Sequence, residues 1–145
     1  MRFLYLAIIL VAGCKTNSTI HDEKEIRNLL DSIIAADNRS DLRKVLSCYA
    51  DDAVLMPANK PPVKGMDAIK QNYTVIFENS LLHIESHIEE IKTTITWAAV
   101  TGYNTGNVVL KKDSSSIPVN DKFIMLLEKQ KDTWKIKRLI WNKNQ

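Results

Sequence analysis

Asp37 is the residue best placed for acid–base chemistry, because it extends the apolar face of a predicted helix. Apolar residues recur at helical spacing between about residues 22 and 38, at Ile26, Leu29, Leu30, Ile33 and Ile34. Asp37 follows Ile33 by four residues and therefore lies on the same face. A carboxyl group in an apolar surrounding has a raised pKa and can act as a general base. The alternative is a carboxylate that caps the helix end or turns toward solvent.

His83 and His87 are a second possible source of chemistry, through metal binding. On a helix, their spacing of four residues would suit a metal ion. On a strand, they share a face with Glu85, and that face points away from the neighbouring isoleucines. We expect these histidines in solvent or at a dimer face, and we predict no metal site.

The start of the chain carries a motif for covalent modification. Met1-Arg2 is basic, residues 3–11 form an uninterrupted apolar run, and Val11-Ala12-Gly13-Cys14 follows. This order is typical of a secretory signal, and the run is shorter than the about 20 residues that a membrane-spanning helix needs. The tetrapeptide resembles the lipobox of bacterial lipoproteins. That resemblance implies that Cys14 is lipidated, becomes the mature N-terminus and anchors the protein to a membrane. The alternative is an ordinary signal-peptide cysteine without lipid.

Cys48 is then the one remaining cysteine, so the sequence predicts no internal disulfide. It falls in a predicted short helix over residues 42–49, and a buried cysteine usually packs as a small hydrophobic residue. We interpret Cys48 as part of the core and not as a nucleophile.

Length and composition indicate one globular domain. The chain has 145 residues, of which 45% are hydrophobic and 26% charged, and its formal net charge is +3. Lys and Glu are interleaved, and we find no basic stripe that alternates with aromatic residues, so nucleic-acid binding is not expected.

The candidate residues above must be positioned by secondary structure. The sequence predicts helices mainly in its first half and strands mainly in its second half. We expect helices over about residues 22–38, 42–49 and 66–78, with Ser40 or Asp41 capping the second. Strands are expected over about 53–56, 93–110, 122–129 and 134–142, with a polar loop over 111–120. Residues 82–92 fit either a helix or a strand with a bulge at Glu89-Glu90. This order predicts an α+β fold, with helices on one face of an antiparallel sheet.

Three stretches together resemble a known family. Residues 40–54, residues 56–69 and residues 134–142 are similar in order and spacing to the SnoaL-like branch of the nuclear transport factor 2-like superfamily. The resemblance implies a cone: a strongly bent sheet wrapped around the first helix, with a cavity open at one end and frequent dimers through the sheet. It also favours a strand over residues 82–92.

The resemblance also implies where catalytic groups would lie. In ketosteroid isomerase relatives, an Asp base precedes the proline after the first short strand, and here that position is Met56. The oxyanion-binding Tyr position on the first helix corresponds to Ile33. Neither residue can transfer a proton, which argues against isomerase chemistry and against an enzyme of that type. Relatives similar to scytalone dehydratase use histidines with an aspartate, and Asp37 with His87 could imitate that pair.

A pocket in such a cone would be mostly apolar with few polar groups. On one predicted strand, Trp97, Ala99, Thr101 and Tyr103 share a face, which would serve as a wall if it looks inward. The expected pocket residues are Ile33, Asp37, Tyr49, Met56, Tyr73, Trp97, Tyr103 and Trp141.

We therefore expect a signal peptide over residues 1–13, a lipidated N-terminus and tether over 14–21, and one domain over 22–145. The expected protein is exported and lipid-anchored to a bacterial cell-envelope membrane, at the periplasmic face or the cell surface. It would be a homodimer that binds a small apolar molecule and needs no cofactor. Two alternatives stay open: a dehydratase, cyclase or isomerase that uses Asp37 as general base, and a dimeric assembly module of the envelope.

Overall fold

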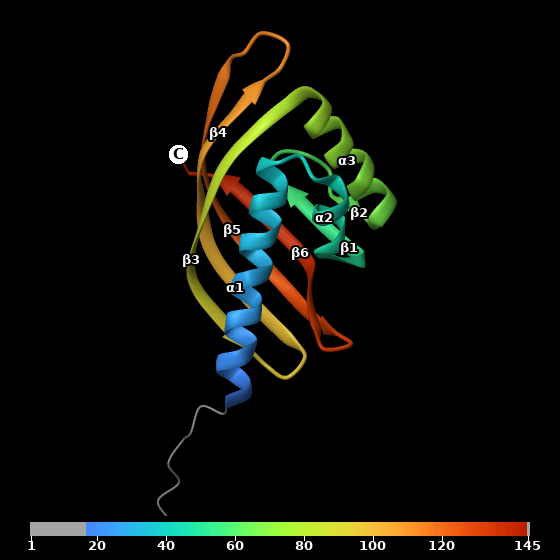
Figure 1. Cartoon of the computed structure of the whole chain (residues 1–145), viewed down its shortest axis with the longest axis vertical. Helices are drawn as coiled ribbons and strands as arrows, with labels where there is room; N and C mark the ends of the chain where they lie inside the picture. Colours follow the sequence, from blue (N-terminus) through green and yellow to red (C-terminus); the bar gives the residue numbers. More distant parts are fainter. Residues whose placement is uncertain (1–16, 145) are drawn as a thin grey trace, which may run out of the picture.

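The computed structural model describes residues 17–144, and Cys14 with the predicted signal peptide lies outside them. Three helices and six strands follow one another (Figure 1): α1 Asn17–Asn38, α2 Leu42–Ser47, β1 Tyr49–Pro57, β2 Val63–Lys64, α3 Met66–Asn79, β3 Ser80–Thr93, β4 Trp97–Leu110, β5 Ser116–Gln130 and β6 Thr133–Lys143. Among residues 17–144, none of the helices has the length and hydrophobicity that a membrane span requires.

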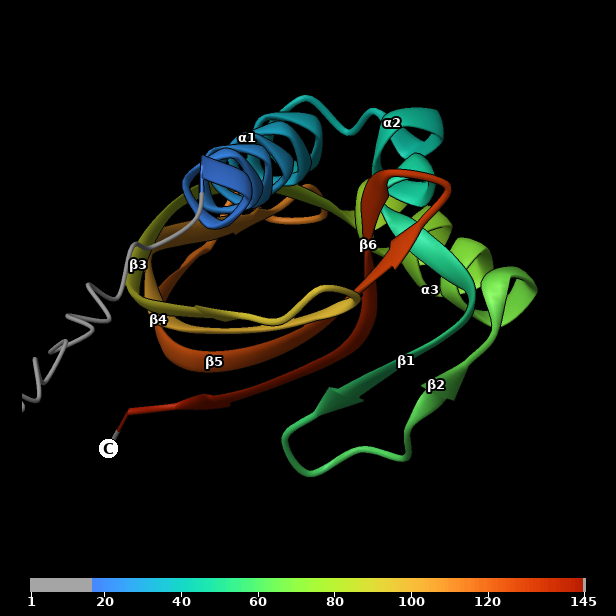
Figure 2. The same cartoon turned by 90° about the horizontal axis from the view of Figure 1, so that it is seen from below.

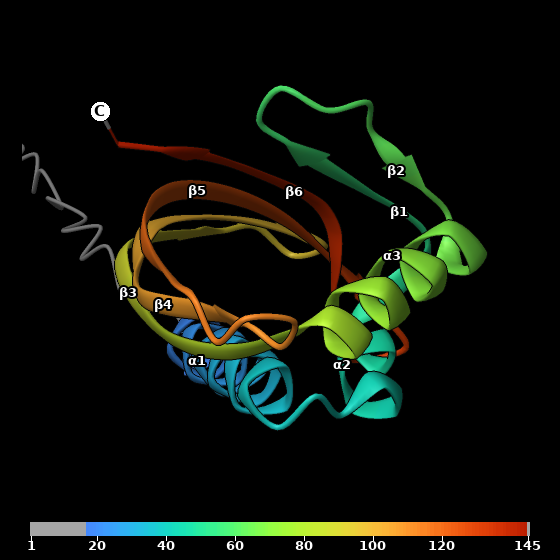
Figure 3. The same cartoon turned by 90° about the horizontal axis from the view of Figure 1, so that it is seen from above.

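The strands form one curled sheet in the order β2-β1-β6-β5-β4-β3. Seen nearly along α1, the sheet bends beneath this helix (Figure 2). Figure 3 shows α2 and α3 grouped at the other side of the molecule, beside β1 and β2. This arrangement confirms the predicted α+β class with a strongly bent sheet and N-terminal helices.

One detail of the predicted sheet is wrong: it is mixed and not wholly antiparallel. β1 pairs with β6 in parallel, whereas the other neighbouring strands are antiparallel. The parallel pair arises because the chain enters the sheet at β1 and returns beside it only with its last strand, after the long β3–β5 meander.

Both ends of α1 are fixed to the sheet by side chains. Near its start, the Asp22 carboxylate accepts hydrogen bonds from Lys129 Nζ at 2.7 Å and from Trp134 Nε1 at 3.2 Å. At its end, Asn38 Nδ2 donates to the Ile84 carbonyl and Asn38 Oδ1 accepts from the Ile84 amide, both at 2.8 Å. These contacts set the position of the helix over the strands.

The predicted bounds of several elements differ from the observed ones. α1 begins at Asn17, so residues 17–21, which we expected in the tether, are helical. β5 begins at Ser116, inside the segment 111–120 that we expected as a loop, because residues 116–120 pair with β4. The Asp41 cap is confirmed: its side chain accepts from the Lys44 amide at 3.0 Å.

The strand interpretation of residues 82–92 is also confirmed, together with its bulge. β3 pairs with β4 along its whole length, and the register shifts between Ile88 and Glu90. Glycines on β4 allow the two strands to approach: a Cβ on Gly102 would lie 2.1 Å from the His87 carbonyl oxygen, and one on Gly106 would lie 2.0 Å from that of His83. Gly106 also has a φ of +123°, which residues with a side chain rarely adopt.

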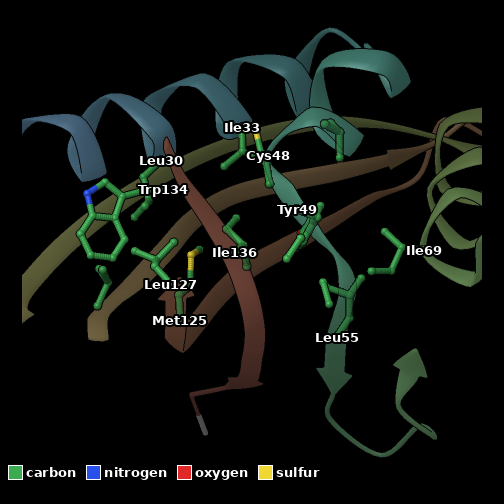
Figure 4. Packing of buried hydrophobic residues seen from close by; sticks show 14 of the residues in the cluster. Leu30, Ile33, Cys48, Tyr49, Leu55, Ile69, Met125, Leu127, Trp134 and Ile136 are labelled. Atoms are coloured by element: carbon green, nitrogen blue, oxygen red, sulfur yellow. The ribbon is translucent and has the colours of Figure 1, made fainter. Parts of the chain in front are cut away.

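The hydrophobic core lies between α1, α3 and the inner face of the sheet. Figure 4 shows side chains from these elements meeting there, including Leu30 and Ile33 of α1, Leu55 of β1 and Met125 of β5. Each of these four side chains is buried.

The outer face of the sheet is partly apolar as well. It exposes large apolar side chains on three neighbouring strands: Trp97, Tyr103, Ile124, Leu126 and Ile140. Thr101, Ile124 and Ile140 are in register across β4, β5 and β6, so they form one row. We call these residues the outer apolar face.

Candidate functional site

The candidate site is a cavity of about 330 Å³ between α1, α3 and the inner face of the sheet. Its size falls within the about 300–1,000 Å³ that is usual for small-molecule sites. Most of its walls are apolar and come from every layer of the fold: Ile33, Ile34, Leu55, Ile76, Leu82, Ile84, Val108, Val119, Met125, Leu139 and Trp141. The described residues that line it include no Lys, Arg or His.

Asp37 points into this cavity from the last turn of α1. The 3.6-residue period that buries Ile26, Leu30 and Ile33 carries on to Asp37, and the neighbouring Asn38 holds this turn against β3. Asp37 Oδ1 is buried and has no hydrogen-bond partner among the described residues. Burial therefore raises the pKa of Asp37 from 3.8 to about 7, so that it exchanges protons near neutral pH.

Tyr49 and Tyr73 form an aromatic corner beside Asp37. Their hydroxyl oxygens are 2.8 Å apart and hydrogen-bonded, and both side chains are buried. Burial raises the pKa of each phenol, and the nearby Asp37 charge raises both further, so the tyrosines stay neutral. The tyrosine hydroxyls bond to each other, and Asp37 Oδ1 receives neither of their protons.

A second polar group lies on the inner face of the sheet, and two of its three members, Asn104 and Asp121, line the cavity. Ser86, Asn104 and Asp121 are in register across β3, β4 and β5, and we call them the polar row. Ser86 Oγ, Asn104 Oδ1 and Asp121 Oδ1 are all buried without a hydrogen-bond partner among the described residues. Burial raises the pKa of Asp121, and Lys143, its register partner on β6, opposes that rise.

The polar row was missed by the sequence analysis. The period-two pattern could have found Asp121, because Phe123, Met125 and Leu127 are buried on the same face of β5. Asp121 was passed over because the strand was expected to begin at Lys122. Asn104 lies on the same face of β4 as the buried Ala98 and Val100, whose small size gives a weak hydrophobic pattern.

Five of the eight expected pocket residues line the cavity. They are Ile33, Asp37, Tyr49, Tyr73 and Trp141. They come from α1, β1, α3 and β6, so the fold brings together side chains that are more than a hundred residues apart in the sequence.

Met56, Trp97 and Tyr103 are not in the lining. Leu55 lines the cavity from β1, which turns the adjacent Met56 to the other side of the strand. Trp97 and Tyr103 lie on the outer apolar face, so the face with Ala99 and Thr101 does not look inward. The inner face of β4 needs small residues, since a Cβ at Gly102 would lie 2.8 Å from the Phe123 ring.

The side chains of His83 and His87 lie on the face of the sheet opposite to the cavity. His87 stacks on Tyr103 with ring centroids 4.7 Å apart, and its Nε2 lies 3.3 Å from Thr105 Oγ1, on the outer face of the sheet. His83 is exposed on the same strand. The structure therefore does not form the Asp37–His87 pair that the resemblance implied.

Cys48 is buried at the start of β1 and unpaired with any described cysteine. Burial raises the pKa of its thiol, which disfavours the reactive thiolate. This surrounding fits a core residue.

Residues His21, Asp22 and Glu25 are the one described group with the spacing of metal ligands. Asp22 Oδ1, however, already accepts from Lys129 and Trp134, and the Lys129 hydrogen bond holds the pKa of Asp22 below its usual value. A cation there would displace the ammonium group of Lys129. We therefore assign no metal to this group.

Several solved structures are similar to this chain in fold. A ketosteroid isomerase-like protein from Erwinia carotovora atroseptica SCRI1043 is 27% identical, with a TM-score of 0.77 over 84% of this chain and 95% of that one. An NTF-2 like protein of unknown function from Shewanella oneidensis MR-1 is 26% identical, with a TM-score of 0.69 over 83% and 98% of the two chains. A candidate scytalone dehydratase from Novosphingobium aromaticivorans DSM 12444 is 14% identical, with a TM-score of 0.78 over 89% and 88%.

None of the curated proteins compared with this chain matches it. The family comparison is decisive for the domain, because residues 18–140 match the SnoaL-like domain, which is most of the chain. The chain belongs to the SnoaL-like domain family.

Proposed function

We propose that this protein binds a small, largely apolar molecule in the cavity between α1 and the sheet. The observation that carries the proposal is an apolar cavity of about 330 Å³ that contains buried, unpartnered polar atoms. Such atoms cost free energy unless a partner reaches them, and a bound molecule with polar groups would supply one.

Native mass spectrometry of the full chain, with lipid and metabolite extracts, tests binding directly. The wild-type protein should retain a bound species, and Val108→Trp, which fills the cavity, should lose it. Val109→Trp is the matched control, because Val109 is the next residue of β4 and does not line the cavity. Retention of the same species by Val108→Trp, or no bound species at all, would contradict the proposal.

The proposed setting is a membrane surface outside the cytoplasm, with the domain held by a lipid on Cys14. The support is the sequence of residues 1–14, in which a basic start, an apolar run and small residues precede the cysteine. Cys14→Ala should abolish palmitate labelling and partition into detergent, whereas Cys48→Ala should change neither. Labelling of the Cys14→Ala protein would overturn the anchor.

A second candidate function is proton-transfer catalysis with Asp37 as the general base. It is favoured by the pKa of about 7 for Asp37 in an apolar cavity, since a base titrating near neutral pH is efficient. The likeness to a ketosteroid isomerase-like protein adds support, although Ile33 and Met56 stand where the isomerase groups would be expected.

Deuterium exchange tests this candidate without the natural substrate. The α-protons of a small bicyclic ketone, 2-tetralone, should exchange with heavy water faster when the wild-type protein is added, as measured by NMR. Asp37→Asn should return the exchange to the rate in buffer, and Asp31→Asn, at an exposed position of α1, should not. No acceleration by the wild-type protein counts against catalysis of this kind.

We also propose that two copies pair through the outer apolar face. The support is the row of exposed apolar side chains on three neighbouring strands, with Glu85 on β3 and Lys122 on β5 beside it. A second copy turned by a two-fold axis would set the apolar residues of the two copies against each other.

A further inference from the structure

The unpartnered atoms of the cavity have a chemical character in common. The buried oxygens of Asp37, Asn104 and Asp121 that lack partners are carboxylate or amide carbonyl oxygens. An ionised carboxylate and an amide carbonyl accept hydrogen bonds and cannot donate them. A molecule that satisfies them must therefore bring hydrogen-bond donors.

The charges of the lining side chains indicate which kind of hydrogen-bond donor a ligand would bring. Two lining residues are acids, and the described lining contains no basic side chain. Asp121 lies in register with Lys143, which partly balances it. The Asp37 charge raises the pKa of the neighbouring Cys48, Tyr49 and Tyr73, which are all neutral, and no cation among the described residues lowers the pKa of Asp37 itself. Asp37 is thus the acid of the cavity without a compensating positive charge.

The aromatic surroundings of Asp37 suit a cation as well. Tyr49 and Tyr73 line the cavity next to it with ring centroids 6.1 Å apart, and Trp141 lines it from β6. The faces of aromatic rings attract organic ammonium ions, most strongly where water is excluded. A carboxylate beside aromatic rings in an apolar cavity is a combination that recognises a cation with a hydrophobic body.

We propose that the cavity selects a hydrophobic organic ammonium ion, whose charged group pairs with Asp37 beside Tyr49 and Tyr73. The apolar part of this ion lies against the aliphatic walls, and Asn104 and Asp121 accept from any further donor at the sheet wall. The inference rests on the proposed binding function and specifies its ligand class. A neutral molecule with hydroxyl groups would satisfy the acceptors but would leave the Asp37 charge unbalanced.

The proposed ligand class is tested with three probes of nearly equal shape, which carry an ammonium, a hydroxyl or a carboxylate group: 1-naphthylmethylamine, 1-naphthylmethanol and 1-naphthoate. Binding to the full chain is measured by calorimetry at pH 8. We expect the amine to bind about tenfold more tightly than the alcohol, as one net ion pair in a partly dry site would give, and the carboxylate not to bind measurably. Asp37→Asn should lower the affinity for the amine to that for the alcohol and leave the alcohol unchanged. Asp31→Asn, exposed on the same helix, removes the same charge and should change neither affinity.

The outcomes separate the inference from the function on which it rests. If the alcohol binds as tightly as the amine, and Val108→Trp abolishes both, the cavity binds small molecules and the ammonium preference is wrong. The preference is also wrong if Asp37→Asn leaves the amine affinity unchanged. If no probe binds while mass spectrometry finds a neutral species in the cavity, the inference fails and the function stands. If neither method finds a bound molecule, both fail.

Discussion

The protonation of the Asp37 carboxyl group connects the binding proposed for the cavity with the stability of the fold. Its Oδ1 atom is buried without a partner among the described residues, and burial raises its pKa from 3.8 to about 7. A carboxyl group with a raised pKa in the folded state destabilises the fold when it is ionised. Its contribution is therefore least harmful at low pH and becomes unfavourable as pH rises from about 4 to about 7.

Asp37→Asn should consequently stabilise the free protein at pH 8. The gain in the free energy of unfolding is at most about 4 kcal/mol, which is the difference between the two pKa values expressed as energy. At pH 4 most of the gain should be gone, because Asp37 is then protonated in the folded state and partly protonated in the unfolded state. Urea unfolding at pH 8 and pH 4 measures the difference, with Asp31→Asn as the exposed control. An equal effect of Asp37→Asn at both pH values would show that its charge is not buried.

The placement of Asp37 could be predicted from sequence, whereas that of Asn104 could not. Asp37 sits on a long helix whose apolar period is strong, so one position followed from the others. Asp121 follows in the same way from the alternation of Phe123, Met125 and Leu127 once β5 is extended toward its start. Asn104 depends on which face of β4 looks inward, and the aromatic residues of β4 suggested the opposite face. The inner face carries Ala98 and Gly102 because bulky side chains from neighbouring strands already occupy the space.

At the scale of elements, the side chain of Asn38 joins the end of α1 to the edge strand β3. β3 is the last strand of the sheet, so its outer edge has free backbone groups. At Ile84, the side-chain amide of Asn38 donates a hydrogen bond to the backbone carbonyl and accepts one from the backbone N–H. This contact fixes the helix turn that carries Asp37.

Asn38→Ala should weaken this attachment. We expect a loss of about 1–2 kcal/mol in the free energy of unfolding, because two hydrogen bonds are lost at a site that water reaches. Hydrogen exchange of the Ile84 amide should become faster, which NMR can follow. Arg39→Ala, at the next exposed position, is the control and should change neither quantity. Unchanged exchange at Ile84 would contradict the role of Asn38.

The β3–β4 pair depends in the same way on Gly106. Gly106→Ala should destabilise the protein by at least about 2 kcal/mol, since the new Cβ meets the His83 carbonyl and the φ is unfavourable. Gly65→Ala is a matched control, because Gly65 also has a positive φ but its Cβ would lie at an ordinary contact distance of 4.0 Å from the Asp51 carbonyl oxygen. Its cost should be smaller than that of Gly106→Ala, because only the backbone conformation, with φ +79° and ψ 164°, is unfavourable. If urea unfolding shows that Gly106→Ala and Gly65→Ala lower the free energy of unfolding equally, the close approach of β3 and β4 at Gly106 does not contribute to stability.

At the scale of the whole molecule, the sequence predicted the class of fold better than it predicted which strands pair with each other. Helical and strand periods gave the α+β class, and the resemblance gave the bent sheet. The parallel pairing of β1 with β6 joins strands from the two ends of the domain, and no local pattern records such a partner. The start of β5 was missed for a similar reason, because residues 116–120 contain Pro118, which is typical of a loop, and they become a strand only by pairing with β4.

The outer apolar face leads to a prediction about assembly. Ile124→Glu should convert a dimer into a monomer, as measured by light scattering after size-exclusion chromatography, because it puts a charge in the centre of the face. Ile117→Glu is the control: Ile117 is 39% exposed, is also on β5 and lies outside the outer apolar face as defined. A wild-type protein that is monomeric at micromolar concentration would rule out the pairing.

The two attachments of α1 also decide how this domain would respond to mechanical tension. A pull from the N-terminal side enters at the first turns of the helix, where Asp22 holds Lys129 and Trp134 of the β5–β6 hairpin. The load would pass into that hairpin, which is paired to its neighbours along most of its length. The far end of α1, with Asp37 and the cavity, lies beyond this attachment, so tension applied from the N-terminal side would act on the Asp22 contacts before it reached the cavity.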